Sequence, residues 1–64
     1  MKLRELKPGS YFTIKEIPWP KDNQVWVKGQ YDRGTKSFSC NPFDDYNNEK
    51  LIKADKEVYT DFTF

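Results

Sequence analysis

The chain has 64 residues, a formal net charge of +1 and 33% charged residues, with one cysteine and no histidine. This length allows one domain, residues 1–64, which buries only a small share of its surface. The lone cysteine and the lack of histidine exclude an internal disulfide and a zinc site. Packing of the aromatic side chains, 17% of the chain, or a partner must therefore stabilise the fold.

The first predicted element is a short amphipathic segment from Met1 to Lys7. Leu3 and Leu6 within it are spaced for one helical turn, although the segment is also compatible with an irregular path. The Pro8-Gly9 pair that follows is a turn former and ends this segment.

A strand is predicted from Ser10 to Ile17, where β-branched and aromatic residues are frequent. Phe12 and Ile14 are its expected inward-facing pair. The next segment, residues 18–23, holds Trp19 between two prolines. These prolines favour an extended, polyproline-like loop.

A β-hairpin from Gln24 to Phe43 is the dominant predicted element. Two alternating runs flank the turn Asp32-Arg33-Gly34-Thr35, in which we expect Gly34 to need a positive φ. A pair between Tyr31 and Lys36 would close a four-residue loop and set the register of the two strands.

This register divides the hairpin into an apolar and a polar face. The apolar face combines Val25, Val27, Gly29 and Tyr31 with Phe38 and Cys40, and it places Gly29 opposite Phe38 and Val27 opposite Cys40. The other face is polar except for Trp26, which shares it with Lys28 and Gln30. We expect the apolar face to turn toward the core.

The second strand of the hairpin ends at Asn41-Pro42, because proline cannot donate to the ladder. The polar run from Phe43 to Glu49 predicts turns or one loose helical turn. Two more strands are expected, Lys50 to Ala54 and Glu57 to Phe64, with a tight connection at Asp55-Lys56. The last strand presents on one face Val58, Thr60, Phe62 and Phe64.

Four to five short strands in this length predict an all-β fold. A small SH3-like barrel or rolled antiparallel sheet is the expected architecture, because curling reduces the exposed edges. A flat sheet packed under the N-terminal segment is the alternative.

Three pieces of the chain carry a family resemblance. They are K-P-G-S-Y-F (Lys7 to Phe12), V-W-V-K-G-Q-Y-D-R (Val25 to Arg33) and D-K-E-V-Y-T-D-F-T-F (Asp55 to Phe64). With these, most of the chain resembles a set of small bacterial and phage-associated SH3-like β-barrel proteins of unknown function. The resemblance implies a compact β fold and implies no activity or cofactor.

The residues do not favour an enzyme. General acid–base catalysis at neutral pH usually uses histidine or carboxylates with shifted pKa values. Asp44-Asp45 lies in a polar loop, where solvation is expected, and Cys40 lacks an imidazole to activate it. We therefore expect no catalytic residues and no cofactor, with Cys40 acting as a small buried apolar residue.

The run from Asp44 to Glu49 contains five carboxylate or amide side chains, whose oxygens suit Ca²⁺ chemically: Asp44, Asp45, Asn47, Asn48 and Glu49. The order of these residues differs from that of an EF-hand loop. We assign no metal site there.

Binding of another macromolecule is the expected function. The candidate binding residues are Trp19, Trp26, Lys28, Arg33 and Lys36. Protein interaction is the leading hypothesis, including self-association through an edge strand, because Trp19 between two prolines loses little entropy on binding. The competing interpretations are that Trp19 closes one end of the barrel and that Leu3 and Leu6 cover Trp26.

Single-stranded nucleic-acid binding is the alternative function, through stacking of bases on aromatic residues beside Lys and Arg. The near-neutral charge argues against it. The chain has no apolar run long enough for a membrane span or a signal peptide. With its single cysteine, this predicts a cytoplasmic protein.

Overall fold

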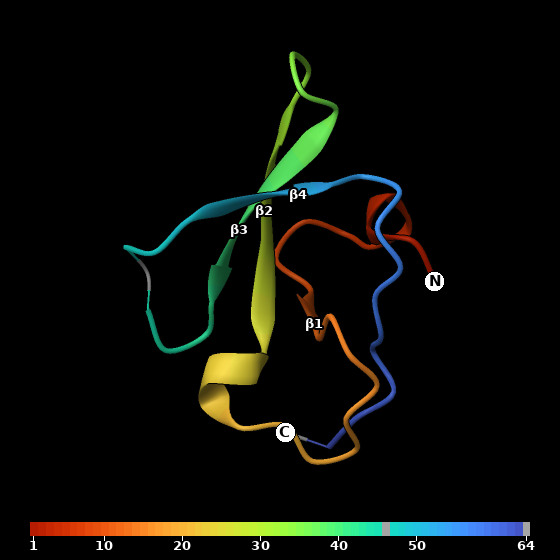
Figure 1. Cartoon of the computed structure of the whole chain (residues 1–64), viewed down its shortest axis with the longest axis vertical. Helices are drawn as coiled ribbons and strands as arrows, with labels where there is room; N and C mark the ends of the chain where they lie inside the picture. Colours follow the sequence, from red (N-terminus) through yellow and green to blue (C-terminus); the bar gives the residue numbers. More distant parts are fainter. Residues whose placement is uncertain (46, 64) are drawn as a thin grey trace.

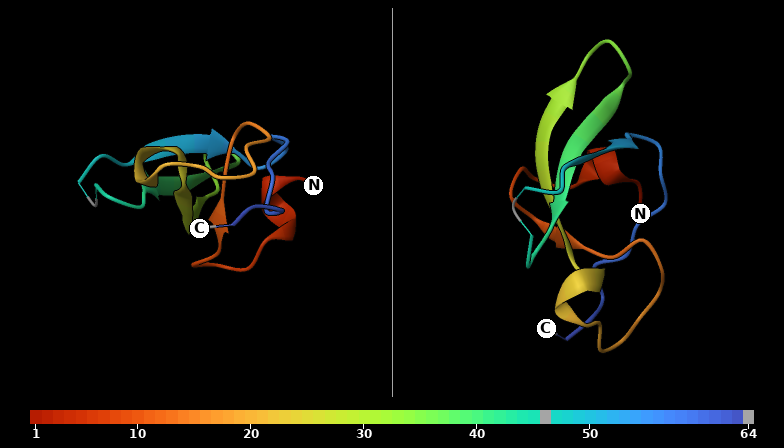
Figure 2. Two further views of the ribbon diagram at one scale, coloured as in Figure 1. Left: turned by 90° about the horizontal axis from the view of Figure 1, so that it is seen from below. Right: turned by 60° about the vertical axis from the view of Figure 1, so that its left-hand side comes forward.

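A computed structural model describes residues 1–45 and 47–63 of the chain, and it contains one antiparallel sheet with the strand order β1-β2-β3-β4 (Figure 1). The strands and the two 3-10 turns are η1 (Leu3–Glu5), β1 (Tyr11–Phe12), η2 (Asp22–Gln24), β2 (Trp26–Asp32), β3 (Ser37–Pro42) and β4 (Lys50–Lys53). The sheet is curled into a half-barrel, which confirms the all-β prediction (Figure 2). In the described residues, no helix is long and apolar enough to cross a membrane.

The core lies between the curled sheet, the N-terminal turn and the C-terminal segment. Its buried cluster consists of Leu3, Phe12, Cys40, Ile52 and Val58. Leu6, Ile14, Trp26 and Phe38 are partly buried and pack against it. The predicted inward positions of Phe12 and Cys40 are therefore confirmed.

The hairpin of β2 and β3 is confirmed, but its predicted register is wrong. The observed pairs are Trp26 with Pro42, Val27 with Asn41, Lys28 with Cys40, Tyr31 with Phe38 and Asp32 with Ser37. Tyr31 therefore does not pair with Lys36, and Val27 does not lie opposite Cys40. The two halves of the ladder are separated by an irregularity between Lys28 and Tyr31.

A close approach of the two strands explains this irregularity. A Cβ atom at Gly29 would lie 2.0 Å from the carbonyl oxygen of Ser39. No real Cβ contact is so short, so the backbones can approach in this way only where the residue is glycine. The local departure from regular pairing has the character of a β-bulge, which displaces the register.

The turn of the hairpin also begins one residue later than predicted, at Arg33. The carboxylate of Asp32 accepts a hydrogen bond from the Gly34 N–H at 3.0 Å, so Asp32 ends the strand and starts the turn. The positive φ belongs to Lys36, at 53°, and not to Gly34. The carbonyl of Lys36 accepts a hydrogen bond from the Ala54 N–H at 3.1 Å, which ties the turn to the end of β4.

The displaced register directs the opposite face of β2 toward the core. Cross-strand partners share a face, so Lys28 lies on the side of Cys40. Lys28 is only 4% exposed, whereas Val27, predicted to face inward, is half-buried. Tyr31 is 50% exposed because the turn end of the hairpin projects beyond the rest of the molecule (Figure 1).

The predicted first strand is shorter than expected, and the predicted last strand does not form in residues 57–63. β1 has two residues, and the chain bends after Thr13, whose hydroxyl donates a hydrogen bond to the Lys15 carbonyl at 2.6 Å. Such local bonds compete with a sheet ladder. Residues 57–63 form only isolated bridges, Thr13 with Tyr59 and Lys2 with Glu57, instead of a strand.

The C-terminal segment nevertheless closes the open side of the sheet. It runs beside residues 13–18 (Figure 1), and the Thr63 N–H donates to the Pro18 carbonyl at 2.9 Å. Val58 is fully buried, as its predicted face requires. Phe64, predicted on the same face, and Tyr46, within the predicted polar run, lie outside the described residues.

Candidate functional site

Trp26 begins β2 and lies at the rim of the core. Its indole is half-buried and packs against the core cluster, as Leu6 does. The predicted placement of Trp26 on the outer face of the hairpin is therefore wrong. Among the described residues the indole N–H has no hydrogen-bond acceptor, and no buried polar side-chain atom lacks a partner. The N–H is thus accessible from outside.

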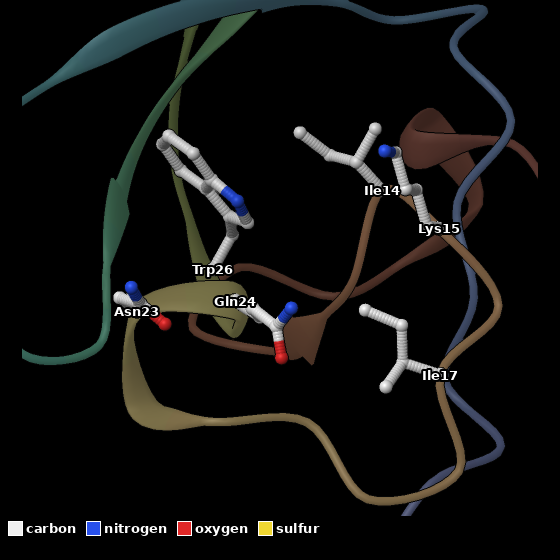
Figure 3. A pocket seen from close by; sticks show the side chains of 6 residues that line it. All are labelled: Ile14, Lys15, Ile17, Asn23, Gln24 and Trp26. Atoms are coloured by element: carbon white, nitrogen blue, oxygen red, sulfur yellow. The ribbon is translucent and has the colours of Figure 1, made fainter.

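An apolar pocket of about 280 Å³ lies on one side of Trp26. It is lined by Ile14, Lys15, Ile17, Asn23, Gln24 and Trp26. Figure 3 shows Ile14 and Ile17 across the pocket from the indole, whose nitrogen edge is turned toward them. The pocket therefore combines apolar walls with several hydrogen-bond donors, the Trp26 N–H and the polar ends of Lys15, Asn23 and Gln24.

An acidic pocket of about 440 Å³ lies on the other side of Trp26. It is lined by Asn23, Trp26, Pro42, Asp44, Asp45, Asn48 and Lys50. The Lys50 ammonium lies 5.8 Å from the centroid of the Trp26 ring, within reach of a cation–π interaction. Since both pockets share Asn23 and Trp26, we treat them together as the Trp26 groove.

Trp19 projects from the loop of residues 18–21 beside this groove. It is 77% exposed, so the predicted exposure is confirmed and the alternative of a lid over the barrel end is wrong. Ile17 and Asn23, at the two ends of the loop, line the apolar pocket. The loop is held by the hydrogen bond from Thr63 to Pro18 and by burial of Pro20. We call it the Trp19 loop.

Lys28 does not belong to this surface. Its ammonium donates a hydrogen bond to the Leu6 carbonyl and lies 4.0 Å from the centroid of the Phe38 ring. Burial lowers the pKa of Lys28 and the charge of Cys40 opposes this change. The outward position predicted for Lys28 is wrong, because the register shift turns it inward.

Arg33 and Lys36 are exposed at the turn of the hairpin. They lie at the other end of β2 from Trp26. At about 3.3 Å per residue, the strand separates the two ends by roughly 20 Å. The structure therefore places the loop that carries Trp19 next to the pocket lined by Trp26, and it leaves Arg33 and Lys36 apart from both.

Sequence reasoning did not predict the acidic pocket. It considered Asp44 and Asp45 only as catalytic or metal-binding residues, and no group of three His, Cys, Asp or Glu in residues 1–45 and 47–63 is placed to hold a metal ion. Asn23, Gln24 and Lys50 were not singled out at all. Their assembly around Trp26 depends on contacts between distant segments, which leave no local signal.

Comparison of the chain with protein-family models, with curated proteins and with solved structures finds no match.

Proposed function

We propose that the chain is a non-enzymatic protein-interaction module that binds through the Trp26 groove and the Trp19 loop. The observation that carries this proposal is the 77% exposure of Trp19 in a loop whose ends line the groove. A tryptophan held between two prolines has little conformational freedom to lose on binding. Tryptophan is also enriched among the residues that dominate interface energies.

The chemistry of the groove suits an extended peptide. The apolar pocket can take an apolar side chain, and the Trp26 N–H can donate to a backbone carbonyl of the peptide. Asp44 and Asp45 in the acidic pocket suit a basic side chain, and the Trp26 ring, near which Lys50 of the same chain lies, suits a cation too. Aromatic grooves of this kind bind polyproline-type segments.

The size of the apolar pocket also favours a side chain over a cofactor. Its volume of about 280 Å³ is below the range of about 300–1,000 Å³ that small-molecule sites usually have. Burial raises the pKa of the Cys40 thiol, although a hydrogen bond from the Gly29 backbone and the charge of Lys28 both act to lower it. A buried thiol with a raised pKa is a poor nucleophile. We also propose that the protein is cytoplasmic and that it belongs to the small bacterial and phage-associated SH3-like β-barrel proteins that its sequence resembles.

The nucleic-acid alternative has less support. Single-strand binding needs stacking aromatics and cations along one path. Here Lys28 is buried, Trp26 is half-buried, and Arg33 and Lys36 lie at the far end of β2. The groove itself contains two carboxylates beside Lys15 and Lys50, so it has no excess of positive charge to attract phosphate groups.

A displayed library of extended peptides, selected on the whole chain, tests the proposal. We expect the enriched peptides to combine proline or aromatic residues with Lys or Arg, and to shift the NMR resonance of the Trp26 indole N–H. Trp19→Ala should weaken binding by about tenfold or more. Tyr31→Ala, which alters an exposed aromatic at the far end of β2, should leave it unchanged. If no common pattern is enriched, or Trp19→Ala has no effect, the proposal is wrong.

A further inference from the structure

We propose that the Trp26 groove binds the Trp19 loop of a second copy of this chain, in a reciprocal two-fold dimer. This inference rests on the function proposed above, because it uses the same groove and names its occupant. Trp19 of each copy would enter the apolar pocket of the other, and Lys21 would reach the acidic pocket.

The Trp19 loop has the character of a ligand for this groove. Its sequence P-W-P-K, residues 18–21, combines prolines, an aromatic side chain and a cation. The loop is already tied to the body of the molecule through Pro18 and Pro20. It would therefore dock with little loss of freedom, which is the advantage of a preorganised segment.

The groove offers this segment apolar walls and, in the acidic pocket, two carboxylates beside the single cation of Lys50. Ile14, Ile17 and the Trp26 edge offer walls for an indole, and the Trp26 N–H offers a donor for a backbone carbonyl. Lys21 follows Trp19 by two residues and is exposed. Its charge is opposite to that of Asp44 and Asp45 on the other side of Trp26.

The position of the two parts favours a closed dimer. Each copy carries the loop and the groove side by side, because Ile17 and Asn23 join the loop to the pocket wall. A two-fold axis that brings one loop to the other groove also makes the reverse contact, so the assembly closes. The outer strands are less suited to pairing, since β1 has two residues and β4 has lysine at both ends.

Analytical ultracentrifugation of the whole chain over a wide concentration range tests this inference. We expect a monomer–dimer equilibrium whose dissociation constant rises about tenfold or more in Trp19→Ala. Leu51→Ala is the matched control, because Leu51 is 55% exposed but lies on β4, outside the groove. It should leave the dissociation constant unchanged.

Charge-swap variants test the contact of Lys21 directly. Lys21→Glu and Asp45→Lys should each weaken the dimer, and the double variant should restore it, since the opposite charges again face each other. A chain that stays monomeric, a dimer unaffected by Trp19→Ala, or a double variant that fails to restore association would overturn the inference. The peptide library is selected at protein concentrations below the dimer dissociation constant, where the groove is empty, so its result decides the proposed function separately.

Discussion

Lys28 illustrates how much depends on the environment of one residue. Its ammonium is buried without a carboxylate beside it among the described residues. The Leu6 carbonyl and the face of Phe38 partly replace the water that burial removes. Because this replacement is incomplete, the pKa of Lys28 falls below its usual value of 10.5. The charged form thus costs stability in the folded chain.

This cost predicts a pH dependence of stability. Between its lowered folded pKa and 10.5, Lys28 binds more protons in the unfolded chain than in the folded one. The free energy of unfolding should therefore rise with pH in this window, by at most about 1.4 kcal/mol per pH unit. Lys28→Met should remove this rise, as measured by urea denaturation at successive pH values.

The chain with Lys28 and the Lys28→Met variant should both carry Cys40→Ala in this comparison. The raised pKa of Cys40 acts in the opposite direction, because stability falls as pH rises above 9.0 and the unfolded thiol ionises first. Lys15→Met, at an exposed position, controls for the loss of one charge. Equal slopes with and without Lys28 would show that its burial does not affect its titration.

Gly29 is the residue on which the hairpin geometry depends. A Cβ at this position would collide with the Ser39 carbonyl oxygen at 2.0 Å, and a backbone atom cannot move aside as a side chain can. Gly29→Ala should therefore lower the free energy of unfolding by about 3 kcal/mol. In Gly34→Ala the Cβ would lie 3.4 Å from Asp32 Oδ1, so this control should change stability by less than about 0.5 kcal/mol. Similar midpoints of urea denaturation for the two variants would contradict the prediction.

At the scale of elements, the C-terminal segment packs like a strand without forming a ladder. Residues 57–63 are attached through the bridges to Lys2 and Thr13 and through the Val58 N–H, which donates to the Met1 carbonyl at 2.8 Å. Their main apolar contribution is Val58, fully buried in the core cluster. The segment therefore depends on side-chain burial more than on its few backbone bonds.

This dependence predicts the effect of shortening Val58. Val58→Ala should lower the free energy of unfolding by about 2 kcal/mol, from the lost burial of two methyl groups and the cavity that remains. Thr60→Ala, at an exposed position of the same segment, should change it by less than about 0.5 kcal/mol. Thermal denaturation of both variants measures the difference. A loss of stability in Val58→Ala no larger than in Thr60→Ala would show that the segment does not support the core.

At the scale of the whole molecule, the core is small, and the groove lies at the start of β2 while the exposed turn lies at its end. Five residues form the buried cluster of the described chain, and one end of the molecule carries an exposed tryptophan beside a groove. Chains this short often rely on a further source of stability. A second copy bound to the folded chain alone would supply it by mass action.

The melting temperature should therefore rise with protein concentration. Binding that is specific to the folded state stabilises it by about 2.7 kcal/mol when the partner is at 100 times its dissociation constant. Differential scanning calorimetry at several concentrations measures the effect, with Leu51→Ala behaving like the wild type. Trp19→Ala should weaken the concentration dependence and shift it to higher protein concentrations. A melting temperature that is constant for the wild type would contradict a dimer that forms only from folded chains.

The candidate site was only partly predictable. The restricted backbone around Trp19 followed from its two flanking prolines, which act locally, but only the tertiary structure decided between exposure and a lid over the barrel end. The inward side of Lys28 and the half-burial of Trp26 did not follow, because both depend on the pairing of β2 with β3. Asp44 and Asp45 were recognised as a charged pair, but their place beside Trp26 depends on how the loop after β3 folds back.

The sequence by itself determined the local features: the all-β class, the hairpin, the turn at Pro8-Gly9 and the end of β3 at Pro42. Each of these depends on neighbouring residues, through alternation, turn chemistry or the missing proline N–H. Only the tertiary structure decided the register, because alternation shows which residues share a face but not which face meets the core. The register, and with it the face that meets the core, was decided by the close approach of Gly29 to Ser39 and by the hydrogen bond that attaches the turn to Ala54. The groove around Trp26 results from the same long-range contacts.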